Sequence, residues 1–551
     1  MSGPTSVGEL LADAALRAPD ALLVVGEHEG TTADLDRAAD VWARRLAAAG
    51  VLPGQHVGIL LDPRIELLEV MFGAARLGAV VVPISDRLKA AELRFLVAHA
   101  DLTFLVTTDA GKPFVDFPEL LDQGLGLPGP DGRRPAAPLL QHVVMLGEDR
   151  PGYTSLAELD QLVAADRSVD VRVAAGAAAV RPEDPAYVMY TSGTSADPKG
   201  CLLSHGAWVQ QGAAIGRDRY ELDRDSIFWT PLPLFHNGGI ATLMACLDAG
   251  CGYIHTGRFS ADRGIDFLAR YRCTHAIPTF ETIWLPILEH PRRDEYDLST
   301  LQVVLNAGTP ESLRQMQAKL PWVTQLSNYG STEATGHMSM ATRQDDLVAR
   351  TETCGLPLPG MEVRIADPET GALLPPNARG EIQFRGTMCF IGYYHAAPGV
   401  AEAAFTDDGW FHTGDAGTVD ETGHIAFHGR LKDMLKVGGE NVSAAEVEAF
   451  LNTHPAVRLA QVVGAPDDRY TEVPVAFIEL VPGTTLTEQD VIDACIDQIA
   501  TFKIPRYVRF VDEWPMSGTK IQKFVLRERI ATELQDAGQT LAPSPRASSA
   551  S

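Results

Sequence analysis

The chain has 551 residues, which is too many for a single hydrophobic core and predicts two to four domains. Its hydrophobic content of 45% and charged content of 21% are ordinary for a soluble globular protein with large cores. The net charge of -26 argues against binding nucleic acid or an anionic membrane through bulk electrostatics, so any phosphate site must be built locally.

No targeting or membrane segment is expected. Residues 1–10 contain neither a basic segment nor an apolar core, so we expect no signal peptide and a cytoplasmic protein. The most apolar long window, residues 70–84, is interrupted by Arg76 and is too short to span a bilayer, so no stable membrane association is expected. The 7 cysteines lack the spacing of a zinc site and are expected to be reduced thiols.

Strand-type and helix-type patterns alternate in the first region of the chain. Strands are expected at residues 57–61, 79–82 and 103–106, with helices at residues 64–77 and 89–99 between them. This βαβα order predicts a parallel sheet covered by helices. The Pro- and Gly-rich residues 111–138 that follow are expected to form a surface excursion.

This excursion contains Gly124-Leu-Gly-Leu-Pro-Gly129, which has the spacing of a dinucleotide-binding GxGxxG motif. No strand pattern precedes it, and Pro128 lies where the motif requires a helix to begin. We therefore reject this segment as a nucleotide site.

The next segment is the most informative part of the sequence. Residues 186–190 predict a buried strand, and they run into Thr191-Ser-Gly-Thr-Ser-Ala-Asp-Pro-Lys-Gly200. Small residues in such a loop let backbone N–H groups approach an anion, while hydroxyls and Lys199 add donors and charge, which together suit a polyphosphate. An ordinary polar turn explains the composition equally well, and the loop lacks the Gly-Lys-Ser/Thr ending of a Walker A motif.

Alternation of helices and strands resumes after this loop. Helices are expected at residues 204–212 and 238–247, and buried strands at residues 226–229, 275–277 and 301–305. Short alternating runs between glycine turns, at residues 361–365, 380–384 and 424–427, predict a small antiparallel barrel. Beyond Arg430 we expect helices at residues 443–451, 488–499 and 523–534, and strands near Val462, near Phe477 and at residues 507–511.

We place a domain boundary at this last change of pattern. The chain is expected to divide into an N-terminal domain, residues 1–430, and a C-terminal domain, residues 431–535. Residues 536–551 end in a segment rich in Ala, Ser and Pro and are expected to be a disordered tail.

Two carboxylates in the later part of the chain are candidates for a nucleotide site. Glu333 ends Asn328-Tyr-Gly-Ser-Thr-Glu333 beside small hydroxylated neighbours, and Mg²⁺ usually takes one or two carboxylates together with substrate phosphates. Asp415 follows a glycine turn, where a carboxylate that accepts two hydrogen bonds suits a ribose diol. Taken alone, Glu333 is more often a solvated glutamate and Asp415 a turn residue.

Two further segments are rich in charge. Residues 429–441 form a charged, glycine-rich link between the two expected domains, as a hinge would. Residues 515–523 place Lys520 and Lys523 just before the last expected helix, where surface lysines are common.

In their order and separations these motifs resemble those of the adenylate-forming superfamily, in its acyl- and aryl-CoA ligase branch. The resemblance extends over residues 6–534, and five motifs in register make coincidence an insufficient explanation. It implies an α/β fold, with a large N-terminal domain of two α/β subdomains and a small β-barrel, followed by a small mobile α+β C-terminal domain. It also implies ATP, Mg²⁺ and coenzyme A as the cofactor and substrates.

The resemblance assigns roles to individual residues. The ATP phosphates would be held by Thr191, Ser192, Gly193, Thr194, Ser195 and Lys199. Adenine and its surroundings would be bound by Gly308, Asn328, Tyr329, Gly330, Ser331 and Thr332. Asp415 would bind the ribose hydroxyls with the assistance of Arg430, and Glu333 together with Thr191 would bind Mg²⁺.

The implied chemistry has two steps. A carboxylate attacks the α-phosphorus of Mg·ATP, which gives an acyl-adenylate and pyrophosphate, and the thiol of coenzyme A then displaces AMP. Lys520 would bridge the carboxylate and the α-phosphate, with Lys523 as its rival, because the family usually has Gly before this lysine whereas this chain has Thr519. A second departure from the family's pattern is Ser195-Ala-Asp197, which stands where Thr-Gly is usual.

The second step depends on other residues. The family rotates its C-terminal domain about a residue that matches Lys432, which would move Lys520 out of the site. Gly438 and Gly439 would then line a narrow tunnel for pantetheine. His236 matches an aromatic gate between this tunnel and the acyl site.

The sequence says least about the acid. By the resemblance, the acyl pocket is lined by residues 235–243, 280–284, 306–308 and 332–338, and its aromatic side chains suit an aryl or medium acyl group. The polar side chains of Asn306, Thr335 and His337 could bind polar substituents of the acid.

Other functions stay open at this stage. The protein could load a carrier protein, form an amide or activate nitrite for diazotisation, or it could be a nucleotide-binding regulator without catalysis. Gly438 and Gly439 favour coenzyme A as the acceptor, and the retention of Glu333, Asp415 and Lys520 argues against a regulator. Nucleic acid is not an expected partner, and assembly as a homodimer is left open.

Overall fold

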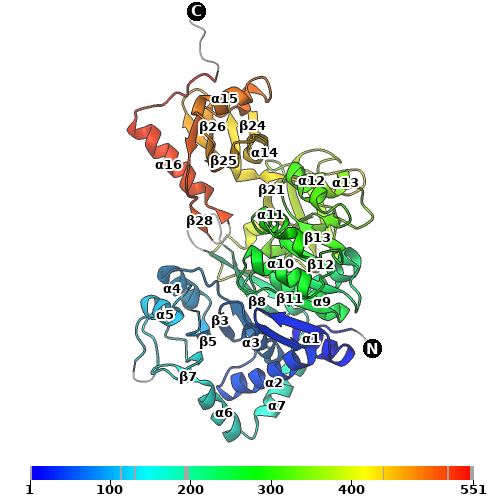
Figure 1. Cartoon of the computed structure of the whole chain (residues 1–551). Coiled ribbons are helices and arrows are strands. Elements are labelled where there is room, and N and C mark those ends of the chain that lie inside the picture. The colour runs from blue at the N-terminus through cyan, green and yellow to red at the C-terminus, as the bar shows by residue number, and fades with distance from the viewer. Residues whose placement is uncertain are drawn as a thin grey trace, which may run out of the picture. The chain divides into compact units, whose positions relative to one another are not determined.

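The chain divides into two units by the contacts between its residues. A computed structural model describes residues 3–111, 114–129, 132–191, 198–437, 440–517 and 520–545 (Figure 1). Unit 1 comprises Met1–Val363 and Phe384–Phe411, and unit 2 comprises Arg364–Gln383 and His412–Ser551. Each unit contains hydrophobic clusters of its own, as expected for a chain of this length.

An eight-stranded sheet organises the N-terminal part of unit 1, in the spatial order β20-β9-β8-β4-β3-β5-β6-β7. Its strands are β3 (His56–Leu60), β4 (Val80–Pro83), β5 (Leu102–Thr108), β6 (His142–Leu146), β7 (Thr154–Ser155), β8 (Pro185–Thr191), β9 (Lys199–Ser204) and β20 (Gly392–Tyr394). The expected parallel arrangement holds from β8 to β7. The sequence prediction missed β9, which runs antiparallel to both β8 and β20.

The helices around this sheet form two groups (Figure 1). The first group packs together as α1 (Val7–Arg17), α2 (Thr32–Ala48), α3 (Ile65–Leu77), α6 (Leu156–Ala165) and α7 (Val169–Ala179). In the second group, α4 (Ala90–His99) packs against α5 (Phe117–Leu125). Helices between successive parallel strands are what the alternating sequence pattern predicts.

Helix α5 corrects the expectation of a surface excursion at residues 111–138. Phe117, Leu121 and Leu125 recur at helical spacing and are fully buried in the same core as the sheet. The GxGxxG pattern lies at the carboxyl end of α5, whose C-cap Gly126 has a φ of 83°. Its rejection as a nucleotide site is therefore consistent with the fold, because such a motif must open a helix rather than end one.

A seven-stranded sheet organises the rest of unit 1, in the order β14-β13-β12-β10-β11-β1-β2. Its strands are β1 (Leu22–Val25), β2 (His28–Thr31), β10 (Ile227–Thr230), β11 (Gly252–His255), β12 (His275–Thr279), β13 (Val303–Asn306) and β14 (Thr324–Leu326). The accompanying helices are α8 (His205–Ile215), α9 (Asn237–Ala249), α10 (Ala261–Arg270), α11 (Glu281–Leu288), α12 (Pro310–Lys319) and α13 (Leu347–Glu352). β1 pairs in parallel with β11, so residues near the N-terminus complete a sheet built mainly by residues 227–326.

The strands that were expected to close into a small barrel form an open sheet. Their order is β18-β19-β21-β22, with β18 (Met361–Ala366), β19 (Gly380–Gly386), β21 (Phe411–Val419) and β22 (Ile425–Arg430). Four strands are too few to curl around an interior of packed side chains, so the predicted closure was wrong. A separate three-stranded sheet contains β15 (Asn328–Tyr329), β16 (Ser339–Met340) and β17 (Leu356–Pro357).

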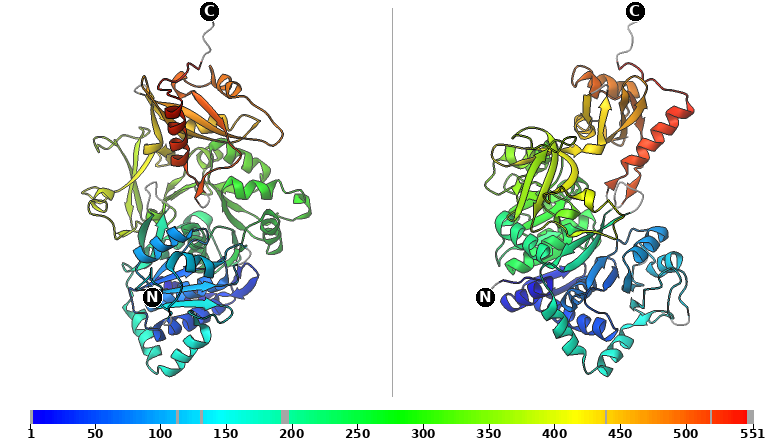
Figure 2. Two further views of the ribbon diagram at one scale, coloured as in Figure 1. Left: turned by 90° about the vertical axis from the view of Figure 1, so that its left-hand side faces the viewer. Right: turned by 180° about the vertical axis from the view of Figure 1, so that it is seen from behind.

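The C-terminal part of unit 2 is an α+β layer. Its sheet has the order β24-β23-β26-β25, with β27 beside β26, and consists of β23 (Met434–Val437), β24 (Glu440–Ser443), β25 (Val457–Asp467), β26 (Thr471–Leu480) and β27 (Tyr507–Phe510). Its helices are α14 (Ala444–Leu451), α15 (Glu488–Cys495) and α16 (Lys523–Asp536). Figure 2 shows α16 along one side of this sheet, where it packs on β25. A hairpin of β28 (Met516–Ser517) and β29 (Lys520–Ile521) precedes α16.

The domain boundary at residues 430 and 431 stays a prediction. It falls between β22 and the short 3-10 turn Leu431–Asp433. Within the predicted tail, the Ala542 amide donates a hydrogen bond to Asp467 Oδ2 at 2.6 Å, and residues 546–551 lie outside the described residues. None of the described helices is long and apolar enough to cross a membrane.

Candidate active site

The predicted phosphate loop lies between the paired strands β8 and β9. Thr191 is opposite Lys199 in the register of this hairpin, and the Thr191 hydroxyl donates to the Lys199 carbonyl at 3.5 Å. Ser192, Gly193, Thr194 and Ser195 fall within residues 192–197, which are outside the described residues. The hairpin therefore fixes both ends of the loop, including the predicted ligands Thr191 and Lys199.

A tight turn after β15 carries the predicted nucleotide motif. Asn328 and Tyr329 form β15, and a Cβ added to Gly330 would lie 1.9 Å from the Gly336 carbonyl oxygen, so only glycine fits there. The Gly336 amide donates to the Ser331 carbonyl at 3.0 Å. The chain then makes one 3-10 turn at Thr332–Ala334, which places Glu333 on a short, closely packed loop.

Glu333 is held by a strand from much later in the chain. The Tyr393 hydroxyl donates to Glu333 Oε1 at 2.8 Å, and the Phe390 amide donates to the Glu333 carbonyl at 2.8 Å. Burial and the neighbouring Glu333 carboxylate raise the pKa of Tyr393, and also that of the Cys201 thiol. The Tyr393 hydroxyl and the Cys201 thiol are therefore both protonated at neutral pH, so the hydroxyl can act as a hydrogen-bond donor.

The donor set around Glu333 fits a hard divalent cation. Among the described residues no three His, Cys, Asp or Glu side chains gather into a metal-binding group. A single carboxylate with a neighbouring hydroxyl suits Mg²⁺, which keeps several waters and takes its other ligands from substrate phosphates.

Gly308 lies where β13 ends and α12 begins. A Cβ there would lie 3.0 Å from Glu281 Oε1, so the backbone and a carboxylate approach each other closely at this turn. Thr309 caps α12 by accepting a hydrogen bond from the Ser312 amide. The turn stands at the carboxyl end of a parallel strand, where α/β sheets commonly bind ligands.

The three polar side chains expected in the acyl pocket have different surroundings. Asn306 Nδ2 donates to Gln325 Oε1 at 2.8 Å, and the Thr335 hydroxyl donates to the Met388 carbonyl at 2.7 Å. His337 Nδ1 lies 2.7 Å from Asn328 Nδ2. Burial lowers the pKa of His337 to about 4, so its imidazole is neutral at pH 7.

A second buried amide adjoins His337. Gln211 Oε1 accepts a hydrogen bond from the His337 amide at 3.2 Å. Neither Gln211 Nε2 nor His337 Nε2 has a hydrogen-bond partner among the described residues. Since Asn328 Nδ2 donates to His337 Nδ1, the proton of the neutral His337 ring is assigned to Nε2, and both orphaned atoms are donors.

His236, the expected gate, is the exposed N-cap residue of α9, and its ring lies 4.8 Å from that of Phe235. The next residue, Asn237, donates from Nδ2 to the Thr332 carbonyl at 3.5 Å. The start of α9 is thus connected to the turn that carries Glu333.

In unit 2 the predicted ribose pair is a cross-strand pair. Asp415 of β21 is directly opposite Arg430 of β22, and Arg430 Nε lies 3.6 Å from Asp415 Oδ1. Asp415 is 9% exposed, and its amide donates to the Thr413 hydroxyl at 3.0 Å. The structure therefore brings these two side chains together as the sequence motifs suggested.

The remaining predicted residues lie near the link and the last hairpin. The backbone of Lys432 is in the 3-10 turn Leu431–Asp433, and Lys520 begins β29 opposite Ser517. Gly438 and Gly439 lie outside the described residues, as do the side chains of Lys432 and Lys520. Lys523, the rival of Lys520, forms an ion pair with Glu448 at 2.6 Å.

Two models of known families match this chain. The AMP-binding enzyme model matches residues 11–394, and the model of the AMP-binding enzyme C-terminal domain matches residues 446–520. The chain belongs to the AMP-binding enzyme family.

Relatives of this AMP-binding enzyme cover nearly its whole length. It is 35% identical over 518 residues to the 3-[(3aS,4S,7aS)-7a-methyl-1,5-dioxo-octahydro-1H-inden-4-yl]propanoyl:CoA ligase of Mycobacterium tuberculosis, covering 92% of this chain and 95% of that protein. It is 32% identical to the mitochondrial medium-chain acyl-CoA ligase ACSF2 of Bos taurus, covering 96% and 88%. The crystal structure of the anthranilate CoA ligase AuaEII in complex with anthranoyl-AMP superimposes with a TM-score of 0.83 at 26% identity, covering 97% and 99%.

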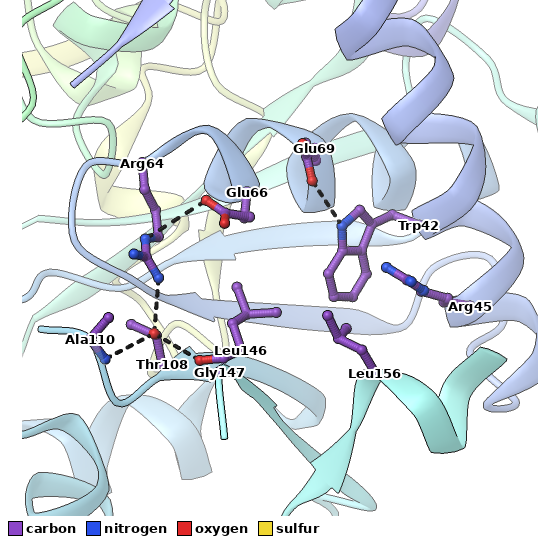
Figure 3. A pocket seen from close by; sticks show the side chains of 10 residues that line it. All are labelled: Trp42, Arg45, Arg64, Glu66, Glu69, Thr108, Ala110, Leu146, Gly147 and Leu156. Atoms are coloured by element: carbon purple, nitrogen blue, oxygen red, sulfur yellow. Dashed lines mark hydrogen bonds and ion pairs between the residues drawn. The ribbon is translucent and has the colours of Figure 1, made fainter. Parts of the chain in front are cut away.

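This AMP-binding enzyme also has a cavity of about 300 Å³ away from all of these residues. It lies beyond the carboxyl ends of β5 and β6 and is lined by Trp42, Arg45, Arg64, Glu66, Glu69, Thr108, Ala110, Leu146, Gly147 and Leu156 (Figure 3). Arg45 already binds Asp160 through two hydrogen bonds, and Arg64 donates to Thr108 at 2.9 Å. Because its cations are engaged and no motif residue lines it, this cavity is not the adenylation site.

Sequence reasoning missed Tyr393, Cys201 and Gln211 as neighbours of the site. Tyr393 lies in Gly392-Tyr-Tyr394, a segment for which no element was predicted. Its only sequence signal is a pair of aromatic residues after a glycine, which is too common to indicate a role.

Proposed function

We propose that this protein is an AMP-forming acyl-CoA synthetase. It activates a carboxylic acid with ATP, and it then transfers the acyl group to the thiol of coenzyme A. The observation that carries the proposal is that Lys199 and Glu333 both contact Tyr393, next to the hairpin that bears the predicted phosphate loop. Both AMP-binding enzyme models match the chain that contains this arrangement.

In the first step an oxygen of the substrate carboxylate bonds to the α-phosphorus, and the bond from that phosphorus to pyrophosphate breaks. Bound ATP with Mg²⁺ supplies the electrophile and the leaving group. Thr191, Lys199 and the loop between them hold the phosphates, and Glu333 with Thr191 holds the metal ion. Their task is positioning and charge neutralisation, because the step brings anions together.

Lys520 bridges the acid and the α-phosphate in this proposal. The ion pair between Lys523 and the partly buried carboxylate of Glu448 supports the choice, because a lysine already paired with a carboxylate is poorly suited to bind a second anion. Lys520 belongs instead to a two-residue strand of a short hairpin.

The second step uses unit 2 in the way the family implies. By analogy with the family, Asp415 and Arg430 would hold the ribose and Lys432 would be the hinge. Gly438 and Gly439 would line the path of pantetheine, and His236 would be the gate to the acyl site. The thiol, after losing its proton to solvent, attacks the carbonyl carbon of the adenylate, and AMP leaves with the electron pair of the broken C–O bond.

We propose an aryl or medium acyl acid that carries a neutral hydrogen-bond acceptor. The orphaned donors Gln211 Nε2 and His337 Nε2 support an oxo or similar acceptor, since a buried donor without a partner costs about 1–3 kcal/mol. The Mycobacterium tuberculosis relative is a ligase for a propanoyl group on a dioxo ring. A cytoplasmic location belongs to the same proposal.

The deciding experiment offers a panel of acids to the purified protein and measures pyrophosphate release, and then adds coenzyme A and detects the thioester by mass. Acid-dependent pyrophosphate followed by a thioester is expected. Pyrophosphate without a thioester would mean another acceptor, such as a carrier protein or an amine. Absence of pyrophosphate release with every acid and with nitrite would overturn the proposal that the protein is an adenylating enzyme.

The acid panel should contain matched pairs that differ by one oxo group. We expect the oxo acid to be preferred by about tenfold or more, because one unmatched buried hydrogen bond is worth that much in discrimination. Gln211→Leu should reduce this preference while leaving activity with the deoxo acid in place. If the preference for the oxo acid is the same before and after this substitution, Gln211 does not contact the acid.

A further inference from the structure

Tyr393 contacts the two charged residues on which the proposed first step depends. Its hydroxyl donates to Glu333 Oε1 at 2.8 Å, and Lys199 Nζ lies 4.7 Å from the centre of its ring. In the strand register Tyr393 is opposite Cys201, two residues beyond Lys199. One side chain thus touches the predicted metal ligand with its polar end and the predicted phosphate ligand with its face.

We propose that Tyr393 is a positioning residue that sets the geometry of Glu333 toward the metal ion and of Lys199 toward the phosphates. This inference rests on the proposed function. Donation to Oε1 occupies one carboxylate oxygen and fixes the orientation of the carboxylate, so that Oε2 is the oxygen presented to a metal ion. Partners of this kind, which orient a ligand without touching the metal, commonly contribute 10- to 100-fold to metal affinity.

The ring has a separate task from the hydroxyl. A lysine ammonium is attracted to the face of an aromatic ring, which restricts where its flexible stem can point. Lys199 begins β9 directly after the phosphate loop, so this contact fixes its ammonium at one side of the loop. Removing the hydroxyl alone should affect the metal ion, whereas removing the whole ring should also affect ATP.

The backbone around Tyr393 is anchored without the help of its side chain. The Ile391 amide donates to the Leu202 carbonyl at 2.9 Å, and the Phe390 amide donates to the Glu333 carbonyl at 2.8 Å. The Thr335 hydroxyl donates to the Met388 carbonyl at 2.7 Å. Substitution of Tyr393 should therefore leave the strand in place, which makes the proposal testable.

The chain offers a matched control in the next residue. Tyr394 also belongs to β20 and also donates its hydroxyl to a carboxylate, Asp101 Oδ2, at 2.9 Å. Its ring packs against His56 and His395 instead of facing the predicted ATP ligands. Tyr393→Phe and Tyr394→Phe therefore remove the same chemical group from neighbouring positions, and only the first removes a partner of Glu333.

The experiment measures Mn²⁺ binding in the presence of ATP by electron paramagnetic resonance, without any acid, so that turnover is not required. We expect Tyr393→Phe to weaken Mn²⁺ binding about 10-fold. Tyr394→Phe should bind as the unmodified protein does. Tyr393→Leu should in addition weaken ATP binding, measured by calorimetry, and Glu333→Gln should remove most Mn²⁺ binding.

The outcomes separate this inference from the proposed function. Unchanged Mn²⁺ binding in Tyr393→Phe, or an equal loss in Tyr394→Phe, would overturn the role of Tyr393. Neither result would alter the acid-dependent release of pyrophosphate by the unmodified protein, on which the proposed function stands. Conversely, the protein and its variants could bind Mn²⁺ and ATP as expected while no acid is adenylated. That result would support the role of Tyr393 and overturn the proposed ligase activity.

Discussion

The ammonium of Lys523 lies 2.6 Å from Oε1 of Glu448, whose same oxygen accepts a hydrogen bond from the Val462 amide at 2.6 Å. Burial raises the pKa of the Glu448 carboxyl, and the Lys523 ammonium opposes that rise. Because Lys523 begins α16 two residues after β29 ends, this ion pair anchors the chain beside Lys520. The two lysines thus have different tasks, which separate measurements can distinguish.

Lys520→Ala should reduce acid-dependent pyrophosphate release by about 100-fold or more, as loss of one preorganised charge at a reacting centre commonly does. Its thermal midpoint should stay close to that of the unmodified protein. Single-turnover kinetics would check the first result and calorimetry the second. Unimpaired adenylate formation in this variant would move the bridging role to Lys523.

Lys523→Ala should mainly lower stability. Removing Lys523 from this partly buried ion pair leaves the Glu448 carboxylate with the Val462 amide but without its cation, which should cost about 1–3 kcal/mol. Chemical unfolding of Lys523→Ala should show this loss, and the double variant Lys523→Met with Glu448→Leu should recover much of it. A Lys523→Ala protein of unchanged stability would contradict the structural assignment.

Asp415→Asn should raise the KM for ATP by about tenfold, since hydrogen bonds to a charged acceptor are worth about 1.5–3 kcal/mol. Asp420 provides the control, because it accepts from the amides of Thr422 and His424 in the turn that follows β21. Asp420→Asn should change stability and leave the KM for ATP as it is. Equal changes of KM in both variants would argue against ribose binding by Asp415.

Gly330→Ala should abolish adenylation and lower the free energy of unfolding by several kcal/mol, because the new Cβ would overlap the Gly336 carbonyl at 1.9 Å. Gly252→Ala is the comparison, since its Cβ would find its nearest neighbour, Ile227 Cγ1, at an ordinary 3.4 Å. Pyrophosphate release and urea unfolding report the two effects. An active Gly330→Ala protein would mean that the turn after β15 is looser than the contacts indicate.

Acid should destabilise unit 1 through its buried histidines. Burial lowers the pKa to about 4 in His205, His255, His275 and His337. The unfolded chain, with a histidine pKa near 6.5, binds more protons between pH 6.5 and pH 4. The contribution of these neutral histidines to the free energy of unfolding is therefore complete above pH 6.5 and is lost as the pH falls toward 4. Urea unfolding at pH 7, 6 and 5 would measure this loss.

His255 identifies one contributor to this slope. Its Nε2 atom lies 2.8 Å from the Leu232 carbonyl, and its Nδ1 atom accepts from the Gly257 amide at 3.0 Å, so a second proton would break a hydrogen bond. His255→Gln should make the decline of stability between pH 6.5 and 5 shallower. An unchanged slope would show that His255 is protonated as easily in the folded protein as in the unfolded one.

The sequence predicted the alternating elements well and missed those whose pattern was interrupted. Every strand and helix expected between residues 57 and 305 is present, because the hydrophobic pattern of a segment reports on its burial. Helix α5 was missed because Pro and Gly around it concealed the spacing of Phe117, Leu121 and Leu125. Strand β9 was missed because Lys199 and Gly200 resemble the end of a loop.

Sequence motifs predicted which residues form the candidate site better than they predicted which side chains those residues contact. The pairing of Asp415 with Arg430 could be anticipated because the resemblance to the superfamily assigns both residues, from separate segments, to the ribose. The contact between Tyr393 and Glu333 joins residues 60 positions apart, and nothing in either segment indicates the other. The same is true of Lys523 and Glu448, whose ion pair depends on how α16 packs near α14 and β25.

The position of β1 has a consequence for synthesis. Leu22–Val25 is synthesised well before its parallel partner β11, which begins at Gly252, so the sheet stays incomplete until more than two hundred further residues have been made. Pairing over such a separation is slow, and an unpaired β11 offers backbone groups to other chains. Removal of residues 1–31 would delete β1 and β2 and make that exposure permanent. We therefore expect the truncated protein to aggregate even though the residues of the proposed active site are all retained.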